Sequence, residues 1–347
     1  MSLRVDVLTL SRPQGRKWSQ LHCAIPELLL LAQITLGMPI GALHTIVALA
    51  EEPLRVPRVG VLMIQEDQPL GQGLRDGLRE LGYVDGKNIV LSWKMAADAE
   101  LRSAAAELAG TKADLIVVGS TPAGRAALEA TTIPVVFLVG DPIAAGFAVS
   151  LAKPGGRATG VSILTTELAS KRLELLRALA PKAGRIAFML NSGNPNNAWQ
   201  LKEVQEAARA LRVQLVRLDI QRKGGVDAAL RQLPGNGASG VVVAADIFLF
   251  VNRAKIAQAV RKAKLPAIFP ATEYHDAGIL MSYGPNLTDT GRALAVYVDR
   301  VLKGANPAEL PVEQVSKFEL VIDVREAARL GLKVPDTLLL RADKVIQ

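Results

Sequence analysis

A serine and a threonine occur at residues 117–126 ("VVGSTPAGRA"), where an apolar run ends and a helical pattern begins. Hydroxyl groups at such a turn could act as a nucleophile, hold a phosphate, bind a ligand or cap the helix. A serine nucleophile on a strand-turn-helix needs Gly-x-Ser-x-Gly and a histidine base. The sequence Gly119-Ser120-Thr121-Pro122 lacks the second glycine. We therefore expect a helix N-terminus here, and no nucleophile.

Other catalytic chemistry has little support. There is no Gly-x-x-x-x-Gly-Lys-Ser/Thr motif, and the glycine-rich residues 153–160 precede a strand-like segment instead of joining a strand to a helix. His, Cys and carboxylate residues are not clustered at metal-ligand spacing. His22 and His44 lie in the first fifty residues, which have the character of an export leader. His275 is therefore the only histidine available as a catalytic base in the rest of the chain. We expect no metal, no cofactor and no enzymatic activity; the alternative, an enzyme on the same scaffold, would depend on His275.

Several polar turns follow predicted strands and could line one binding cleft. They are Ser120-Thr121, Asp141, Asn191-Ser192, Asp246 and Tyr283-Gly284. Each can also be read as a turn former or a helix cap. Helix N-termini and carboxylates around one cleft suit a zwitterion such as an amino acid. Asp246 or Asp141 would receive the ammonium group. Ser120 or Thr121 would receive the carboxylate.

The elements that position these turns alternate between strands and amphipathic helices from Arg58 onward. This alternation predicts an α/β protein with doubly wound parallel sheets, covered by helices on both faces. The predicted strands are residues 59–64, 89–94, 115–118, 135–139, 186–190, 214–218, 240–244 and 267–269. The predicted helices are residues 70–81, 99–109, 122–130, 166–180, 197–211, 225–233 and 248–263.

Two segments of the chain have the same order of predicted elements, and this repetition predicts two similar lobes. Residues 113–137 and 238–269 both run from a buried strand through a polar turn and a helix to an aliphatic-Pro-strand. Ser120-Thr121 and Asp246 then lie at equivalent carboxyl ends of strands, where open parallel sheets bind ligands. We predict a first lobe of residues 56–162 plus 277–305 and a second of residues 163–276 plus 306–347. Several crossovers would form a hinge on which the lobes close.

The first fifty residues have the order of a secretory signal. A basic start precedes an almost uncharged segment, residues 28–50, which ends in Ala48-Leu49-Ala50. We predict export to the periplasm with cleavage after Ala50; an uncleaved membrane anchor is the alternative. The only cysteine, Cys23, precedes the apolar segment, so the exported chain would have no disulfide. A lipid-bearing cysteine should follow the apolar segment, which argues against a lipoprotein.

The formal net charge of +8 does not indicate nucleic-acid binding. Lys and Arg are spread along helices beside Glu and Asp, as in residues 202–212, without a basic run interleaved with aromatics. Solvated helix faces explain this pattern. A DNA-binding repressor of the same fold would need a helix-turn-helix module before the first lobe, where this chain has an apolar leader.

Ordered sequence blocks resemble a known family from about Val56 to the end of the chain. They include "GYVDGKNI", "ADLIVVGSTPAGRAA", "IPVVFLVGDPIAAGF", "KRLELLRALAPKAGRIAFMLNSGNPN" and "GILMSYGPNLTDTGR". The chain is similar to ABC transporter substrate-binding proteins, a family that includes tryptophan- and tyrosine-binding lipoproteins. The resemblance implies a type I periplasmic binding-protein fold with three crossovers and a ligand between the lobes. It also implies a permease and an ATPase in the inner membrane as partners.

The resemblance carries site residues over to this chain. Thr121, Asp141, Asn191-Ser192 and Asp246 match positions that such proteins use around the ligand. Gln65 lies in the first loop, residues 63–69, which lacks the His-Pro pair of the aromatic amino-acid binders. We therefore expect a monomeric, extracytoplasmic solute-binding component of an ABC importer that captures a small carboxylate-bearing molecule of unspecified identity. The alternative is a ligand-binding protein that serves a receptor or sensor kinase.

Overall fold

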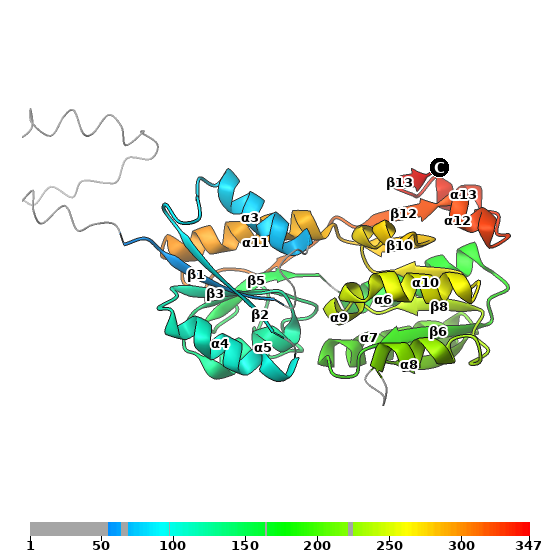
Figure 1. Cartoon of the computed structure of the whole chain (residues 1–347), viewed down its shortest axis with the longest axis horizontal. Helices are drawn as coiled ribbons and strands as arrows, with labels where there is room; N and C mark the ends of the chain where they lie inside the picture. The colour runs from blue at the N-terminus through cyan, green and yellow to red at the C-terminus, as the bar shows by residue number, and fades with distance from the viewer. Residues whose placement is uncertain (1–54, 64–68, 97, 164, 221–224) are drawn as a thin grey trace, which may run out of the picture. The chain divides into compact units, whose positions relative to one another are not determined.

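The computed structural model describes residues 55–63, 69–96, 98–163, 165–220 and 225–347. The chain from Val56 to Gln347 forms one compact unit with two α/β lobes, each built on one sheet (Figure 1). Within these ranges, no helix combines the length and apolar character needed to cross a bilayer. The predicted signal peptide, its cleavage site and Gln65 lie outside the described residues.

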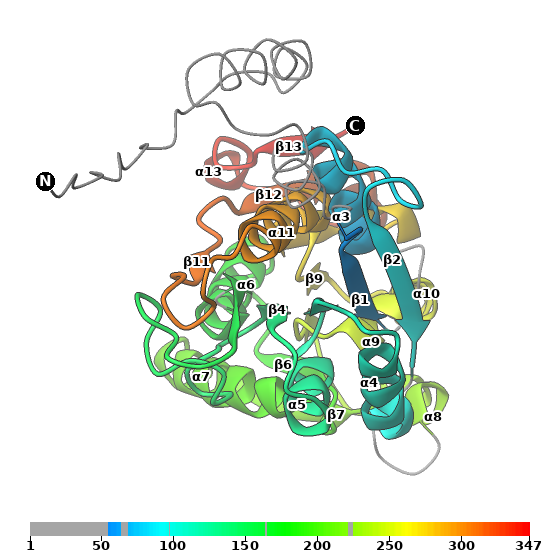
Figure 2. The ribbon, with the colours of Figure 1, turned by 90° about the vertical axis from the view of Figure 1, so that its left-hand side faces the viewer.

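The first sheet is parallel throughout, with the strand order β11-β5-β4-β3-β1-β2. Its side chains alternate between two apolar layers: Val59 and Val61 pack on one face, and Leu62 on the other. Figure 2 shows helices α3 and α11 over one face of this sheet and helices α4 and α5 over the other. The elements of this lobe are β1 (Arg58–Met63), α3 (Pro69–Glu80), β2 (Val90–Met95), η2 (Asp98–Glu100), α4 (Leu101–Gly110), β3 (Leu115–Val118), α5 (Thr121–Ala130), β4 (Val135–Val139), β5 (Ala158–Ser162), α11 (Leu287–Leu302) and β11 (Glu313–Gln314).

The second sheet has the order β13-β12-β10-β9-β8-β6-β7 and is parallel except where β10 pairs with β12. Its central strands are fully buried, which explains their uninterrupted apolar sequences. The elements of this lobe are α6 (Thr165–Leu179), β6 (Arg185–Leu190), α7 (Pro195–Ala210), β7 (Gln214–Asp219), α8 (Gly225–Gln232), β8 (Gly240–Val243), α9 (Ile247–Val251), α10 (Arg253–Lys262), β9 (Ala267–Phe269), η3 (Thr272–Ala277), β10 (Met281–Gly284), β12 (Glu319–Asp323), α12 (Val324–Arg329), α13 (Asp336–Leu339) and β13 (Lys344–Ile346). The predicted α/β class with two parallel-sheet lobes is confirmed.

One predicted helix is interrupted. Residues 248–263 were expected to form a single helix, but α9 ends and α10 begins at Asn252. The Asn252 side chain donates a hydrogen bond to the Phe248 carbonyl at 2.9 Å, which satisfies one of the carbonyl groups at the C-terminal end of α9. A short α9 therefore stands between β8 and α10, with its first turn at the edge of the second sheet.

Two late strands belong to sheets other than those predicted. Strand β10 was assigned to the first lobe, but it pairs with β9 and β12 in the second sheet. Strand β11 was assigned to the second lobe, but it pairs with β5 in the first. Within the described part of the chain, the polypeptide thus passes between the sheets after β5, after β10 and after β11. Helix α11 packs on α3 in the first lobe.

Candidate ligand-binding site

A pocket lies where the carboxyl ends of the two sheets face each other. It encloses about 740 Å³ of space, part of which is open to solvent. Both lobes contribute to its wall, as expected for a cleft at the edges of parallel sheets. The residues that line it are Leu70, Gly119, Ser120, Thr121, Leu138, Val139, Gly140, Ile163, Thr165, Leu168, Arg172, Asn194, Asn196, Ala245, Asp246, Ile247, Phe250, Pro270, Ala271, Tyr274, Pro285 and Leu287.

The first lobe presents the N-terminus of α5 to this pocket. Ser120 is the N-cap: its Oγ accepts a hydrogen bond from Ala123 N at 3.3 Å. Thr121 is the first helical residue, is 3% exposed, and has no hydrogen-bond partner for its hydroxyl within the described residues. Pro122 has no N–H, so the free donors at this helix end belong to Thr121. A positive helix end with an unused hydroxyl suits an anionic group.

The second lobe presents Asp246, the residue between β8 and α9. Its carboxylate is buried and is held only by neutral donors. Leu249 N donates to Oδ1 at 3.1 Å, as expected for an N-cap. Three asparagine amides donate as well: Asn194 Nδ2 at 2.8 Å, Asn197 Nδ2 at 3.3 Å and Asn191 Nδ2 at 3.3 Å from Oδ2.

The orientation of these three amides is fixed by the local backbone. Asn191 Oδ1 accepts from Gly193 N at 3.0 Å, Asn194 Oδ1 accepts from Asn196 N at 3.1 Å, and Asn197 Oδ1 accepts from Asn191 N at 3.0 Å. Each Nδ2 group therefore points toward Asp246 as a donor. A cradle of donors stabilises an ionised carboxylate better than a protonated one.

The carboxylate of Asp246 has hydrogen-bond donors around it but is not neutralised by an ion pair within the described part of the chain. Burial raises its pKa above the ordinary value, and the hydrogen bonds from Asn194, Leu249 and Asn191 oppose that shift. Among the described residues, no basic side chain forms an ion pair with this carboxylate. A buried charge without a counter-ion is costly. This carboxylate therefore favours a cationic group in the pocket.

A buried arginine also lines this pocket. Arg172 of α6 donates to the Tyr283 carbonyl at 3.2 Å and to Gln200 Oε1 at 3.5 Å. Gln200 also binds both the N–H and the carbonyl of Ala245, the residue before Asp246. Desolvation lowers the pKa of Arg172 to about 10, and its Nε has no partner within the described residues. Arg172 thus connects the end of β10 to the backbone that carries Asp246.

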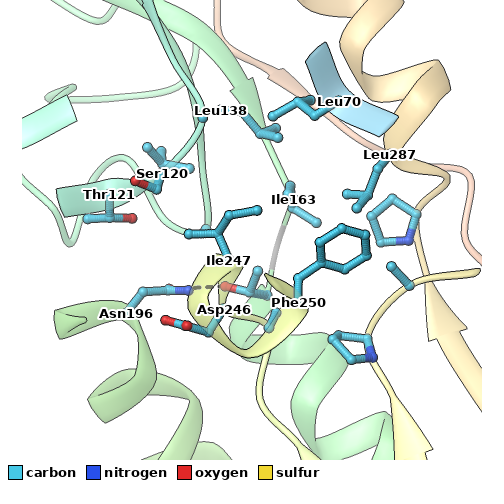
Figure 3. Close-up of a pocket in the computed structure, with 18 of the residues that line it drawn as sticks. Leu70, Ser120, Thr121, Leu138, Ile163, Asn196, Asp246, Ile247, Phe250 and Leu287 are labelled. Atoms are coloured by element: carbon cyan, nitrogen blue, oxygen red, sulfur yellow. Dashed lines mark hydrogen bonds between the residues drawn. The ribbon is translucent and has the colours of Figure 1, made fainter. Parts of the chain in front are cut away.

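The remainder of the pocket is mostly aliphatic. In Figure 3 the apolar side chains lie toward one side of the view, and the polar residues Thr121, Asn196 and Asp246 lie toward the other. The apolar group includes Leu70, Leu138, Ile163, Phe250 and Leu287. A pocket with a few polar groups at one side and an apolar remainder can orient a ligand by its charged end.

The structure separates the residues that sequence reasoning grouped together. Ser120, Thr121 and Asp246 line the pocket; whether they contact a ligand stays a prediction. Asn191 lies behind Asp246, as described above. The other predicted residues of the described chain do not line the pocket and have roles of their own.

Those roles are structural. Asp141 caps its own turn, because its Oδ1 accepts from Ile143 N at 3.0 Å and from Ala144 N at 2.9 Å. Ser192 is exposed, and its N–H donates to Asp219 at 3.2 Å. The Tyr283 carbonyl accepts from Arg172, and Gly284 packs against Pro270.

Sequence reasoning missed Arg172, Asn194, Asn197 and Gln200. Arg172 and Gln200 lie on the buried stripes of α6 and α7, where apolar residues are expected. A charged or amide residue on such a stripe indicates a buried polar contact. This signal is present in the sequence and could have been used.

His275 does not line the pocket. Its Nε2 lies 3.0 Å from Ser282 Oγ, and burial lowers its pKa to about 4. Within the described ranges, no group of His, Cys, Asp and Glu residues could hold a metal ion.

The architecture of two sheets joined by three crossovers is that of type I periplasmic binding proteins. The chain belongs to the ABC transporter substrate-binding protein family, whose model matches residues 59–346. A tyrosine-binding protein of Clostridioides difficile is 28% identical over 272 residues, which cover 76% of this chain and 78% of the relative. The family resemblance predicted from the sequence is confirmed.

Two solved structures are similar over most of the chain. A conserved domain protein of Vibrio cholerae matches with a TM-score of 0.78 at 28% identity, over 84% of this chain and 100% of its own. An ABC domain of Streptococcus pneumoniae, solved in complex with L-Trp, matches with a TM-score of 0.77 at 27% identity, over 84% of this chain and 99% of its own. The family model and the tyrosine-binding relative are those of substrate-binding proteins.

Proposed function

We propose that this protein captures a free amino acid with an apolar side chain outside the inner membrane and delivers it to an ABC permease and its ATPase. The observation that carries the proposal is the buried carboxylate of Asp246, which lines the pocket and has no ion-pair partner among the described residues. An α-ammonium group is the cation that such a site would take. The N-terminus of α5, with Thr121, would take the α-carboxylate. The aliphatic side of the pocket would hold the side chain.

The binding relatives support an amino acid as the ligand. One relative is a tyrosine-binding protein and another was solved with L-Trp. The wall of this pocket is mostly aliphatic, with Phe250 and Tyr274 as its aromatic members among the described residues. We therefore include aliphatic as well as aromatic amino acids as candidates. Export through the leader and a monomeric state remain parts of the proposal.

Calorimetric titration against L-amino acids, each paired with an analogue, tests this function. L-Tyrosine is paired with 3-(4-hydroxyphenyl)propionate, which lacks the ammonium group, and with tyramine, which lacks the carboxylate. L-Leucine is paired with 4-methylpentanoate and 3-methylbutylamine. We expect at least one amino acid to bind and both of its analogues to bind much more weakly. Absence of binding by all twenty amino acids in protein stripped of retained ligand would refute the proposal.

Thr121→Val tests the first-lobe half of the site. Because Ser120 provides the cap, the substitution should leave thermal stability nearly unchanged. Loss of a hydrogen bond to a charged group should weaken binding of the amino acid by about tenfold or more. Calorimetry gives the affinity and thermal unfolding gives the stability. Unchanged affinity would leave Thr121 as a helix residue without a role in binding.

The affinity should depend on pH through Asp246. Because burial raises the pKa of this carboxyl, it takes up a proton at a higher pH than an ordinary aspartate does. Protonation removes the charge that holds the ammonium group, so affinity falls as pH decreases through that pKa, by up to about tenfold per pH unit. In ligand-free protein the stability of the fold changes in the opposite direction from the affinity. Because the pKa of Asp246 is raised on folding, the contribution of this group to stability is lost as pH rises through that pKa.

Titrations at a series of pH values, with circular dichroism to verify folding, measure this dependence. Thr121→Val should keep the same pH profile at lower affinity, since it leaves Asp246 in place. An affinity that stays constant down to the lowest pH at which the protein remains folded would show that Asp246 does not bind a cation.

A further inference from the structure

We propose that helix α7 latches the two lobes together through Asn196 and Trp199, and that Gly140 is the receiving surface for this latch. The inference deepens the proposed function, because it assigns the residues that hold the lobes closed around a ligand. It follows from three sets of contacts between segments that are distant in the sequence.

The first contact joins the end of β4 to the start of α7. A Cβ atom at Gly140 would lie 2.3 Å from Asn196 Oδ1 and 2.6 Å from Asn196 Nδ2. It would also lie 2.2 Å from Thr165 Oγ1, which is hydrogen-bonded to Asn196 Oδ1 at 3.0 Å. Thr165 follows β5 closely in the chain, so its approach belongs to the crossover. Asn196 belongs to the second lobe and meets Gly140 only when the lobes are in contact.

The second contact is apolar. Trp199 lies one turn after Asn196 on α7, and its half-buried side chain packs against an apolar cluster of the first lobe. This cluster includes Ala123 and Ala127 of α5 together with Phe147. A tryptophan contributes a large apolar area to a contact of this kind. By contrast, Leu201 on the same helix packs against the cluster of its own lobe.

The third set of contacts connects the latch to the binding site. The N-cap of α7 is Asn194, and both Asn194 and Asn197 donate to the carboxylate of Asp246. The first two turns of α7 therefore hold the proposed ammonium receptor with Asn194 and Asn197 and contact the opposite lobe with Asn196 and Trp199. The same helix contacts both Asp246 and the first lobe. Ligand binding at Asp246 should therefore favour closure of the lobes, and closure should favour ligand binding.

Gly140→Ala is the direct test. Its methyl group would displace the buried side chains of both Asn196 and Thr165, so the closed arrangement, which needs Asn196 beside residue 140, should become less favourable. We expect about tenfold weaker binding of L-tyrosine or L-leucine, whichever the wild-type protein binds more tightly. Gly110→Ala is the control, because a Cβ there has no atom within 4 Å. Equal affinities for Gly140→Ala and wild type would overturn the proposal.

A matched pair on α7 covers the case in which Gly140→Ala perturbs folding. Trp199→Ala should weaken amino-acid binding, whereas Leu201→Ala should lower thermal stability and leave the affinity of the folded protein within about twofold of wild type. Equal affinity losses in the two variants would also overturn the latch. In that case α7 would act only through general stability.

A readout without added ligand separates this proposal from the proposed function. The chain has three tryptophans, so Trp18→Phe and Trp93→Phe leave Trp199 as the fluorophore. In this background, Gly140→Ala should increase quenching by acrylamide and shift the emission to longer wavelength, because Trp199 loses its cover. Identical quenching and emission would overturn the latch even if an amino acid binds. A difference would support it even if the entire amino-acid panel fails to bind.

Discussion

Asp246→Asn is expected to weaken binding of the amino-acid ligand by about 100-fold or more, the largest effect of any single substitution in the pocket. The variant removes the buried negative charge but keeps the shape of the side chain. Because the amides of Asn191, Asn194 and Asn197 are fixed as donors, the new amide of residue 246 would face other donors. We therefore also expect a loss of stability of about 1–3 kcal/mol.

Calorimetry with two ligands distinguishes lost charge from lost structure. For the intact amino acid the affinity should fall sharply, whereas for its analogue without the ammonium group it should change little. Asp141→Asn is the matched control: Asp141 follows a first-lobe strand but caps only its own turn. The Asp141→Asn variant should bind the amino acid with the same affinity as the wild-type protein. Equal losses for both ligands would mean that Asp246 supports the pocket without binding the ammonium group.

Gly284→Ala should produce the largest loss of stability among the predicted site residues. A Cβ at Gly284 would lie 1.8 Å from the carbonyl oxygen of Pro270, so the end of β10 and the segment after β9 must move apart. Overpacking of this kind costs about 1–3 kcal/mol or more. Gly184→Ala in the same lobe is the control, since no atom lies within 4 Å of its Cβ position. The free energy of unfolding, measured by urea denaturation, should fall for Gly284→Ala alone, and equal values would contradict the packing role.

The strands and helices could largely be predicted because their signals are local. Apolar runs such as the one ending at Val118 and the amphipathic stretch of α5 are determined by side-chain periodicity. The Ser120 cap and the Asp246 cap were also readable, since both depend on residues within one helical turn. These local signals placed two polar turns at the edges of two sheets.

The sheet membership of the late strands could not be predicted in this way. Strand β11 has two residues and pairs with β5, about 150 residues earlier in the chain. Strand β10 was assigned to the first lobe with α11, whereas it pairs with β9 before it and with β12, which comes after α11. Such pairings depend on the crossovers, which are tertiary features.

The cradle around Asp246 was missed for a different reason. Asn194 and Asn197 were read as parts of a turn and of a helix start, where asparagine is common. Their function emerges only when α7 is placed beside the end of β8, which brings both amides to the same carboxylate. Arg172 differs, because a charged residue on the buried stripe of α6 is a signal that the sequence itself contains.

Native mass spectrometry of the full-length gene product, isolated from the periplasm of its host, tests the central claim most directly. We predict a chain that begins after Ala50 and carries one small molecule, which fragmentation identifies as an α-amino acid with an apolar side chain. The ligand should be absent from the Asp246→Asn variant prepared in parallel. A retained molecule without an amine, such as a sugar or a simple carboxylic acid, would contradict the assignment of Asp246 as the ammonium receptor.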